Sequence, residues 1–241
     1  MQLSVVIPVY NEVENIGPLL REVATALDGR LEYEIIAVDD GSTDGALAFL
    51  QGLRHGLPVL RLVRHRRNCG QSAALVSGVR AARGPLIATL DGDGQNDPAD
   101  IPALYAEHER QARQPGPVLI AGHRARRQDR WLKRLSSRIA NGVRQGLLRD
   151  DCPDTGCGLK LFSREIFLDL PHFDHLHRFL PALFKRAGAR VVNVPVNHRP
   201  RLRGQSKYGV SNRLWVGVVD LFGVMWLQRR PCRPEVNDEL Q

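Results

Sequence analysis

Short apolar runs alternate with longer amphipathic stretches through the first half of the chain. Strand-like runs cover residues 3–8, 34–38, 59–63, 86–90 and 118–122. Helical patterning covers about 15–27 and 71–82, and a further helix should begin at Asp97-Pro98, because aspartate suits an N-cap and proline the first turn. Strands and helices that alternate at this spacing predict an α/β fold with an open, mostly parallel sheet and helices on both faces.

The second half of the chain is less regular. Its pattern predicts a basic helix over 131–148, a glycine-rich turn at 155–158, a strand at 159–162, a helix at 179–187, a strand at 190–196 and a helix over 213–230. No internal repeat or linker-like segment divides the sequence. We therefore expect one compact unit, in which residues 1–210 form the α/β domain and residues 211–241 form an amphipathic helix and a polar tail.

The composition is that of an ordinary globular protein with an excess of positive charge. The 241 residues are 43% hydrophobic and 25% charged, and the formal net charge is +8. This balance favours an anionic partner, which can be nucleic acid, an anionic membrane or a phosphorylated substrate. Aromatic residues do not interleave with the basic runs as stacking platforms would, so we expect no nucleic acid as a partner.

Two features of the sequence indicate a cytoplasmic protein. No run of about 18 uncharged apolar residues is present, and Met1 and Gln2 lead straight into an apolar strand without the pattern of a signal peptide. The four cysteines show no C-x-x-C spacing and are too few for a disulfide framework in a chain of this length. We expect reduced thiols and a location in the cytosol.

Acidic and amide side chains follow three of the predicted strands. The run Asp91-Gly-Asp-Gly-Gln95 comes directly after 86–90, and the loops after 3–8 and 34–38 carry Glu12 and Asp39-Asp40. The carboxyl ends of parallel strands meet at one crevice, so we expect the three loops to converge there. Carboxylate and amide oxygens suit a hard cation such as Mg²⁺ or Mn²⁺, which keeps open positions for phosphate oxygens. The pattern indicates a metal-assisted transferase.

An ordered series of motifs resembles a known family. The series comprises Val5-Val-Ile-Pro-Val-Tyr-Asn-Glu12, Val38-Asp-Asp-Gly-Ser42, Asn68-Cys-Gly-Gln71, the run from Asp91 to Gln95, and the run from Arg199 to Tyr208. In this order the motifs resemble family 2 glycosyltransferases of the GT-A fold, and among them the dolichyl-phosphate mannosyltransferases and bacterial polyprenyl-phosphate glycosyltransferases. The resemblance runs from about Leu3 to Arg230, nearly the whole chain.

The resemblance implies a role for particular residues. The base and ribose of a nucleotide sugar would be held by Pro8, Tyr10, Glu12, Val38 and Asp40. The Asp-x-Asp motif would be Asp91, Gly92 and Asp93, with the metal bound by Asp93 and Gln95. The donor diphosphate would contact Arg124, Arg201 and Lys207, whose guanidinium and ammonium groups suit phosphate oxygens. Together with Asp91 and Asp93, these three residues would form the catalytic set. On the acceptor side, the resemblance implies Asp154, Arg138 and Ser206, and the run Asp154-Thr-Gly-Cys-Gly-Leu-Lys160 with Arg164 matches the region that closes this side.

The activity implied by the resemblance is an inverting, metal-dependent transfer of one sugar from a nucleotide diphosphate sugar to a polyprenyl phosphate, for cell-envelope glycan or lipid modification. A general base is not required, because a phosphate monoester with a second pKa of about 6 is mostly dianionic at neutral pH. Two alternatives stay open: a family 2 transferase with a soluble or protein acceptor, and a non-catalytic nucleotide-sugar-binding or membrane-scaffold subunit. The sequence does not decide between GDP-mannose and a UDP-sugar.

Two predicted amphipathic helices indicate contact with a membrane surface. Many bacterial members of the resembling family carry C-terminal transmembrane helices, which this sequence lacks. The predicted helices at 131–148 and 213–230 instead pair Trp131, Trp215 and Trp226 with arginines, a composition typical of interfacial helices. Either helix could also pack its apolar stripe against the core. We expect peripheral, reversible attachment to the cytosolic face of an anionic membrane.

Overall fold

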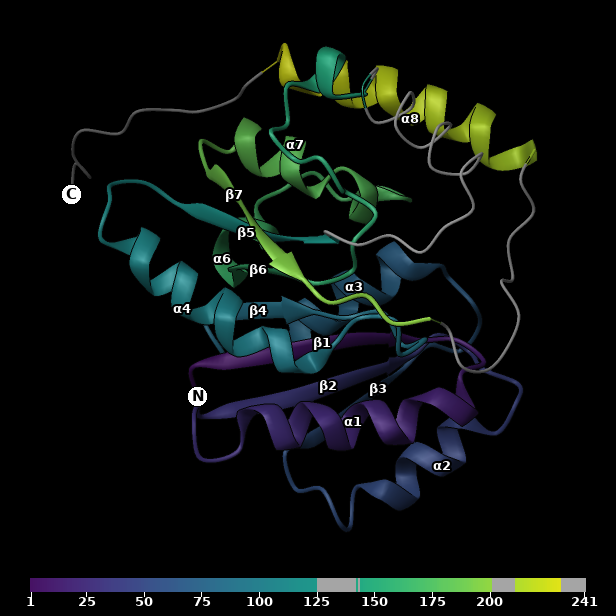
Figure 1. The fold of residues 1–241 in the computed structure, drawn as a ribbon. Helices are drawn as coiled ribbons and strands as arrows, with labels where there is room; N and C mark the ends of the chain where they lie inside the picture. The colour runs from purple at the N-terminus through teal and green to yellow at the C-terminus, as the bar shows by residue number, and fades with distance from the viewer. Residues whose placement is uncertain (125–141, 143, 201–210, 231–241) are drawn as a thin grey trace, which may run out of the picture.

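The computed structural model describes residues 1–124, 142, 144–200 and 211–230 of the chain (Figure 1). Its strands are β1 (Leu3–Val9), β2 (Tyr33–Asp39), β3 (Leu60–Arg64), β4 (Leu86–Thr89), β5 (Val118–Arg124), β6 (Lys160–Ser163) and β7 (Arg190–Val196). Its α-helices are α1 (Val13–Leu27), α2 (Ala46–Leu53), α3 (Gln71–Ala81), α4 (Ile101–Ala112), α6 (Arg164–Leu168), α7 (Leu180–Arg186) and α8 (Ser211–Gln228). Two short 3₁₀ helices are η1 (Pro98–Asp100) and η2 (Leu176–Arg178).

The strands of the described residues form one seven-stranded sheet in the order β3-β2-β1-β4-β6-β5-β7. β1 pairs in parallel with β2 and β4, β2 with β3, and β5 with β7. β6 runs antiparallel to both of its neighbours, with Lys160 opposite Thr89 at the end of β4. The predicted mostly parallel sheet is confirmed, and the reversed β6 is a feature that the sequence pattern did not indicate.

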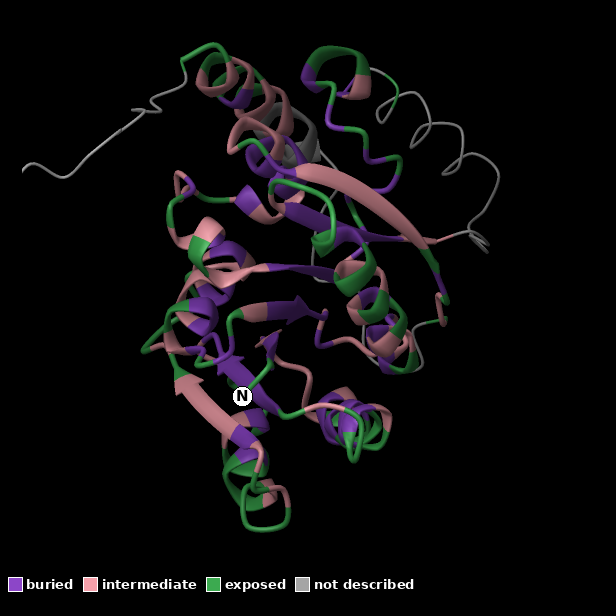
Figure 2. Cartoon of the chain, turned by 90° about the vertical axis from the view of Figure 1, so that its left-hand side faces the viewer, coloured by how far each residue is buried: buried purple, intermediate pink, exposed green. Residues whose placement is uncertain are grey.

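Helices cover both faces of the sheet and enclose two apolar cores. Alternate residues of a strand point to opposite faces. Leu3, Val5 and Ile7 therefore join the core beneath α1 and α4, whereas Val6 joins the core beneath α3, α6 and α7. Figure 2 shows the buried strands at the centre and the exposed residues on the outer surfaces of the helices. Burial on both faces explains why the strands read as nearly continuous apolar runs.

The predicted helices at 15–27, 71–82 and after Asp97 are confirmed as α1, α3 and the η1–α4 segment. The Asp97 side chain accepts a hydrogen bond from the Ala99 amide at 3.0 Å, so it caps the first turn as predicted. α2 and α6 were not predicted, because both are short and α2 follows Gly45 in a left-handed conformation rather than a polar cap. Most of the predicted helix at 131–148 lies outside the described residues.

α8 lies at the end of the molecule farthest from β3 and α2, where it packs against α7 (Figure 1). Val224 of α8 is buried, and Arg186 of α7 donates hydrogen bonds to the carbonyls of Leu227 and Arg230 at 2.8 and 3.0 Å. These contacts join α8 to the α/β domain, while the domain boundary at residue 210 stays a prediction. Across the part of the chain that the structure describes, no helix combines the length and apolar character needed to cross a membrane.

Candidate active site

Hydrogen bonds link the loops that follow β1 and β2. The Asn11 amide donates to Ser42 Oγ at 3.0 Å, and the Asn11 side-chain oxygen accepts from the Thr43 amide at 2.7 Å. Asn11 reaches both partners with a φ of 52°, a left-handed conformation that asparagine tolerates better than most residues. Asp44 also accepts from the Val13 amide at 2.9 Å. The two loops therefore form one unit at the carboxyl edge of the sheet.

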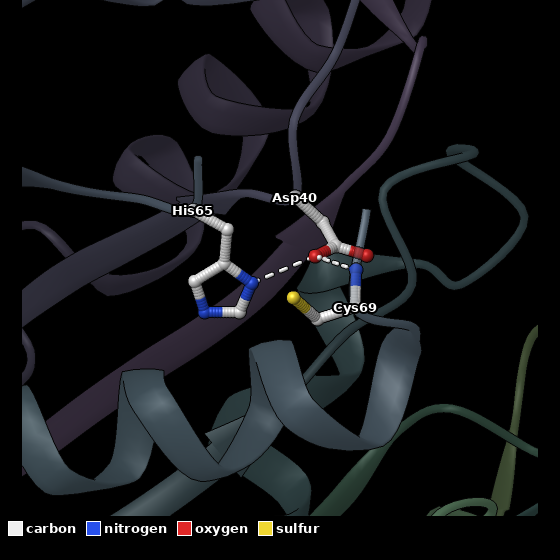
Figure 3. Close-up of side chains that lie close together, drawn as sticks. All are labelled: Asp40, His65 and Cys69. Atoms are coloured by element: carbon white, nitrogen blue, oxygen red, sulfur yellow. Dashed lines mark hydrogen bonds and ion pairs between the residues drawn. The ribbon is translucent and has the colours of Figure 1, made fainter. Parts of the chain in front are cut away.

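Asp40 joins this unit to the loop after β3 (Figure 3). Its Oδ1 lies 2.7 Å from His65 Nδ1 and accepts from the Cys69 amide at 2.8 Å, while its Oδ2 accepts from the Gly70 amide at 2.8 Å. His65 Nε2 in turn lies 2.8 Å from Ser77 Oγ on α3. The potential ligand atoms of Asp40, His65 and Cys69 lie within 4.8 Å of one another. Because the buried carboxylate is already shared among three donors, we interpret the cluster as the support of this loop.

Asp91 lies at the end of β4 in a closely packed position. Gln71, the first residue of α3, donates from Nε2 to Asp91 Oδ1 at 2.7 Å. Gly158 approaches the carboxylate so closely that a Cβ at residue 158 would lie 2.3 Å from Asp91 Oδ2. Burial, and next the charge of Asp93, raise the pKa of Asp91 to about 6, although nearby cations oppose this rise. An added positive charge at this place would favour the ionised form of Asp91.

Hydrogen bonds fix the loop from Asp91 to Gln95, both within the loop and to the segment at Arg199. Asp93 Oδ1 accepts from the Gln95 amide at 3.1 Å, and the buried Asn96 accepts from the Asp91 amide at 3.4 Å. The Gln95 carbonyl accepts from the Arg199 amide at 2.9 Å, which places the segment before the predicted basic loop beside the metal motif. Asp91, Asp93 and Gln95 supply carboxylate and amide oxygens from one loop. This donor set fits Mg²⁺ or Mn²⁺.

Arg124, at the end of β5, forms a bidentate ion pair with Asp154. Its Nε and Nη2 donate to the two Asp154 carboxylate oxygens at 2.6 and 2.7 Å, and its backbone amide donates to the same carboxylate at 3.2 Å. Both side chains are mostly buried, and the paired hydrogen bonds fix the plane of the guanidinium. The resemblance assigned Arg124 to the donor and Asp154 to the acceptor, whereas the structure shows that the two residues form one unit.

A cavity of about 150 Å³ lies between Asp91 and the segment that enters β6. We call it the Lys160 pocket. Its polar side chains are Gln71, Thr89, Asp91, Thr155, Lys160, His177 and Arg178. Lys160 is only 3% exposed, and its Nζ donates to the carbonyl of Thr155 at 3.2 Å and to the carbonyl of Cys157. The pocket thus brings residues from α3, β4, β6 and η2 together beside the metal motif.

The structure places most of the described candidates at this edge of the sheet. Pro8 lines the Lys160 pocket, Tyr10 and Glu12 are half-buried in the loop after β1, and Asp40 supports the loop after β3. The Val38 side chain is completely buried in the core beneath α3, and the assignment of this residue to the nucleotide stays a prediction. Four candidates lie outside the described residues: Arg138, Arg201, Ser206 and Lys207.

Sequence reasoning gave Asn96 no role in the site and gave Gln71 none of its own, whereas the resemblance assigned the run 154–160, with Gly158 and Lys160, to the acceptor side. Gln71 belongs to a motif that was recognised, and Gly158 and Lys160 belong to the predicted turn and the strand that follows it. Local signals therefore existed for three of the four residues. Their contacts around Asp91 depend on the reversed direction of β6, which no local signal encodes.

Two curated relatives are similar over most of this chain. Dodecaprenyl-phosphate galacturonate synthase from Rhizobium johnstonii is 39% identical over 240 residues, which are 97% of this chain and 69% of the relative. Undecaprenyl-phosphate 4-deoxy-4-formamido-L-arabinose transferase from Edwardsiella ictaluri is 36% identical over 211 residues, which are 86% of this chain and 63% of the relative. The chain spans about two thirds of the length of these relatives.

Solved structures share the fold, and a family profile covers most of the chain. Glucosyl-3-phosphoglycerate synthase from Mycobacterium tuberculosis, in complex with Mn²⁺ and UDP among its ligands, has a TM-score of 0.67 at 21% identity over 94% of this chain and 79% of its own. S. aureus TarS in complex with UDP-GlcNAc has a TM-score of 0.63 at 18% identity, over 94% and 67%. These likenesses confirm the predicted GT-A type of fold. Residues 4–170 match the family described as Glycosyl transferase family 2, and with relatives more than 30% identical this shows that the chain belongs to that family.

Proposed function

We propose that the protein transfers one sugar, with inversion, from a nucleoside diphosphate sugar to a polyprenyl phosphate. The observation that carries this proposal is the hydrogen-bonded series of loops, from Asn11 through Asp40 and Gln71 to Asp91, which gathers the motifs of the family on one edge of the sheet. The curated relatives are named for dodecaprenyl or undecaprenyl phosphate, and the solved neighbours hold UDP or UDP-GlcNAc. A UDP-sugar is accordingly the first donor to test.

Asp93 and Gln95 would hold Mg²⁺ or Mn²⁺, with Asp91 beside them. Their oxygen atoms are the ligands that hard cations prefer. Burial and the charge of Asp93 both disfavour the ionised Asp91 and raise its pKa, and a divalent cation would offset both effects. When bound, the ion would also offset the negative charge that develops on the departing diphosphate.

Residues of the chain would position the reacting groups. Gln71 holds the Asp91 carboxylate, and the ion pair of Arg124 keeps its guanidinium in a set orientation. Arg201 and Lys207 would donate hydrogen bonds to the diphosphate as it leaves. The attacking oxygen belongs to the acceptor phosphate, which is already anionic at neutral pH, so no side chain has to remove a proton. Its bond to the anomeric carbon forms as the bond to the diphosphate breaks, which inverts the configuration.

A polyprenyl acceptor would require the enzyme to work at a membrane surface. α8 offers an exposed apolar stripe for this contact, because Val219, Phe222 and Trp226 recur at helical spacing and are 62, 62 and 58% exposed. The Arg230 guanidinium lies over the Trp226 ring, 5.9 Å from its centroid. Apolar side chains beside arginine suit the headgroup region of an anionic bilayer. We therefore place the enzyme peripherally on the cytosolic face of a membrane.

Transfer of a radiolabelled sugar from UDP-sugars to undecaprenyl phosphate in anionic vesicles, with Mn²⁺, tests the proposal. The expected product is a labelled lipid whose formation stops in excess chelator and in Asp93→Ala. The matched control is Asp169→Ala, which removes an exposed carboxylate after α6 and should behave as the wild type. Arg201→Ala and Lys207→Ala should each lose about 2–4 kcal/mol of transition-state stabilisation, seen mainly as lower turnover.

The alternatives give different results in the same assay. Transfer to a soluble or protein acceptor, but not to the lipid, would replace the polyprenyl acceptor. Binding of a UDP-sugar without transfer to any acceptor would favour a nucleotide-sugar-binding subunit. Undiminished turnover in Asp93→Ala, or in excess chelator, would contradict the proposed role of the metal.

A further inference from the structure

The Lys160 pocket contains more positive charge than its own carboxylate balances. Lys160 is almost fully buried, and its Nζ donates to the carbonyls of Thr155 and Cys157 rather than to a carboxylate. Arg178 also lines the pocket, and it forms no ion pair with any of the described residues. Among the described residues that line the cavity, Asp91 is the single carboxylate. The charges of Lys160 and Asp91 attract each other, which leaves the half-buried Arg178 as the surplus cation of the pocket, so an anion that enters this cavity would be stabilised.

The size and place of the pocket fit one sugar ring. Its volume of about 150 Å³ equals that of a protein cavity that accepts benzene, so one six-membered ring can enter, and the substituents of a sugar would bring it against the lining. Its lining includes Asp91 and residues of β6 and η2, but no residue of 40–45 or 65–70, the loops after β2 and β3 that would hold the nucleotide. His177 stands on the same wall as Arg178, with its Nδ1 2.8 Å from Ser72 Oγ. A donor whose diphosphate lies at the metal motif would direct its sugar into this space.

We propose that the Lys160 pocket selects a donor sugar that bears a carboxylate, a hexuronate, and that Lys160 and Arg178 bind this carboxylate. The inference rests on the proposed function, because it requires a nucleoside diphosphate sugar at the metal motif. The carboxylate of a hexuronate is attached to C5 of the ring, whereas the diphosphate leaves from C1 and the acceptor phosphate attacks C1. A carboxylate on C5 would thus be a separate anion from the diphosphate and from the acceptor phosphate, which both meet C1. The two curated relatives are named for different sugars, so family membership alone does not decide this point.

Calorimetric titration with Mn²⁺, in the absence of any acceptor, tests the inference at the binding step. The probes are UDP-glucuronate and UDP-galacturonate, each compared with its neutral counterpart, UDP-glucose or UDP-galactose. The wild type should bind the uronate of each pair roughly ten- to hundredfold more tightly, the range given by hydrogen bonds to a charged group. Arg178→Ala and Lys160→Met should each reduce this ratio by roughly tenfold. Arg113→Ala, which removes an exposed arginine just after α4, should leave the ratio unchanged.

Two variants are used because replacement of the buried Lys160 can unfold the protein. Arg178 is only half-buried, so Arg178→Ala should fold and still test the inference. Equal binding of uronate and neutral donors by the wild type would overturn the inference. An equal loss of affinity for all four donors in Arg178→Ala would overturn it as well. The proposed function fails separately, if a bound donor is not transferred to undecaprenyl phosphate in vesicles. Efficient transfer of a neutral sugar would instead leave that function standing and overturn the hexuronate inference.

Discussion

Replacing Asp91 by asparagine should make the metal-free protein more stable and the enzyme inactive. Burial and the charge of Asp93 raise the pKa of Asp91 from 3.8 to about 6, so the carboxylate is harder to ionise in the folded chain than in the unfolded chain. Asparagine removes the charge but keeps an oxygen that can accept the 2.7 Å hydrogen bond from Gln71. Activity should be lost because the first carboxylate of the metal motif is gone.

The size of the pKa shift gives the size of the effect. One pKa unit corresponds to about 1.4 kcal/mol, so ionisation of Asp91 costs the fold up to about 3 kcal/mol relative to the unfolded chain. Because the pKa is raised in the fold, this cost is absent below about pH 4, grows between about pH 4 and pH 6, and is constant at higher pH. Asp91→Asn should therefore exceed the wild type in free energy of unfolding by about 2–3 kcal/mol at about pH 7.5, and by little at about pH 4.

Urea unfolding in excess chelator, followed by circular dichroism at several pH values, measures this difference. Asp169→Asn is the control, because it removes one negative charge from an exposed position. A gain in stability for Asp91→Asn that is the same at every pH would refute the reasoning. A variant that is less stable than the wild type near neutral pH would show that the surroundings of Asp91 favour its ionised form.

Three further changes have effects that follow from described contacts. Gly158→Ala would place a Cβ 2.3 Å from the Asp91 carboxylate. Sugar transfer should therefore fall by at least roughly tenfold, while the protein still unfolds cooperatively. Normal transfer would show that the Asp91 carboxylate can move away from this Cβ. Asp154→Asn would remove the ionic partner of the buried Arg124 guanidinium, so the free energy of unfolding in urea should fall by about 3 kcal/mol. No change in this free energy would mean that water replaces the ion pair. Phe222→Glu should reduce flotation with anionic vesicles, whereas Phe49→Glu on the distant α2 should not, and equal flotation of the two variants would contradict contact through α8.

The parallel part of the fold could be predicted from the apolar pattern, because β1, β2 and β4 are buried on both faces and stand out from amphipathic helices. The site could be placed for a related reason. The ends of parallel strands share one edge, so the position of Asp91, Asp93 and Gln95 after an apolar strand was enough to locate them there. Local patterns and strand direction together carried this part of the prediction.

Contacts between residues far apart in the sequence could not be predicted in the same way. Asp40 is held by His65 and by two amides 29 and 30 residues further along the chain, and no local pattern encodes such pairs. The direction of β6 depends on its position between β4 and β5 rather than on its own four residues. Val38 is a different case, because likeness to a motif assigned it to the nucleotide, which stays a prediction, whereas packing placed its side chain in the core.

The reversed direction of β6 means that the candidate site is built from two kinds of segment. The loops after β1, β2 and β4 follow the ends of their strands, whereas the turn before Lys160 lies at the start of β6 and reaches the same edge of the sheet. Lys160 stands opposite Thr89, and Thr89 Oγ1 donates to the Gly158 carbonyl at 2.6 Å. This turn takes no part in the pairing of β1 with β2 and β4. If the Lys160 pocket selects the sugar as proposed, changes in one short segment would alter the sugar while the loops after β1 and β2 stay the same.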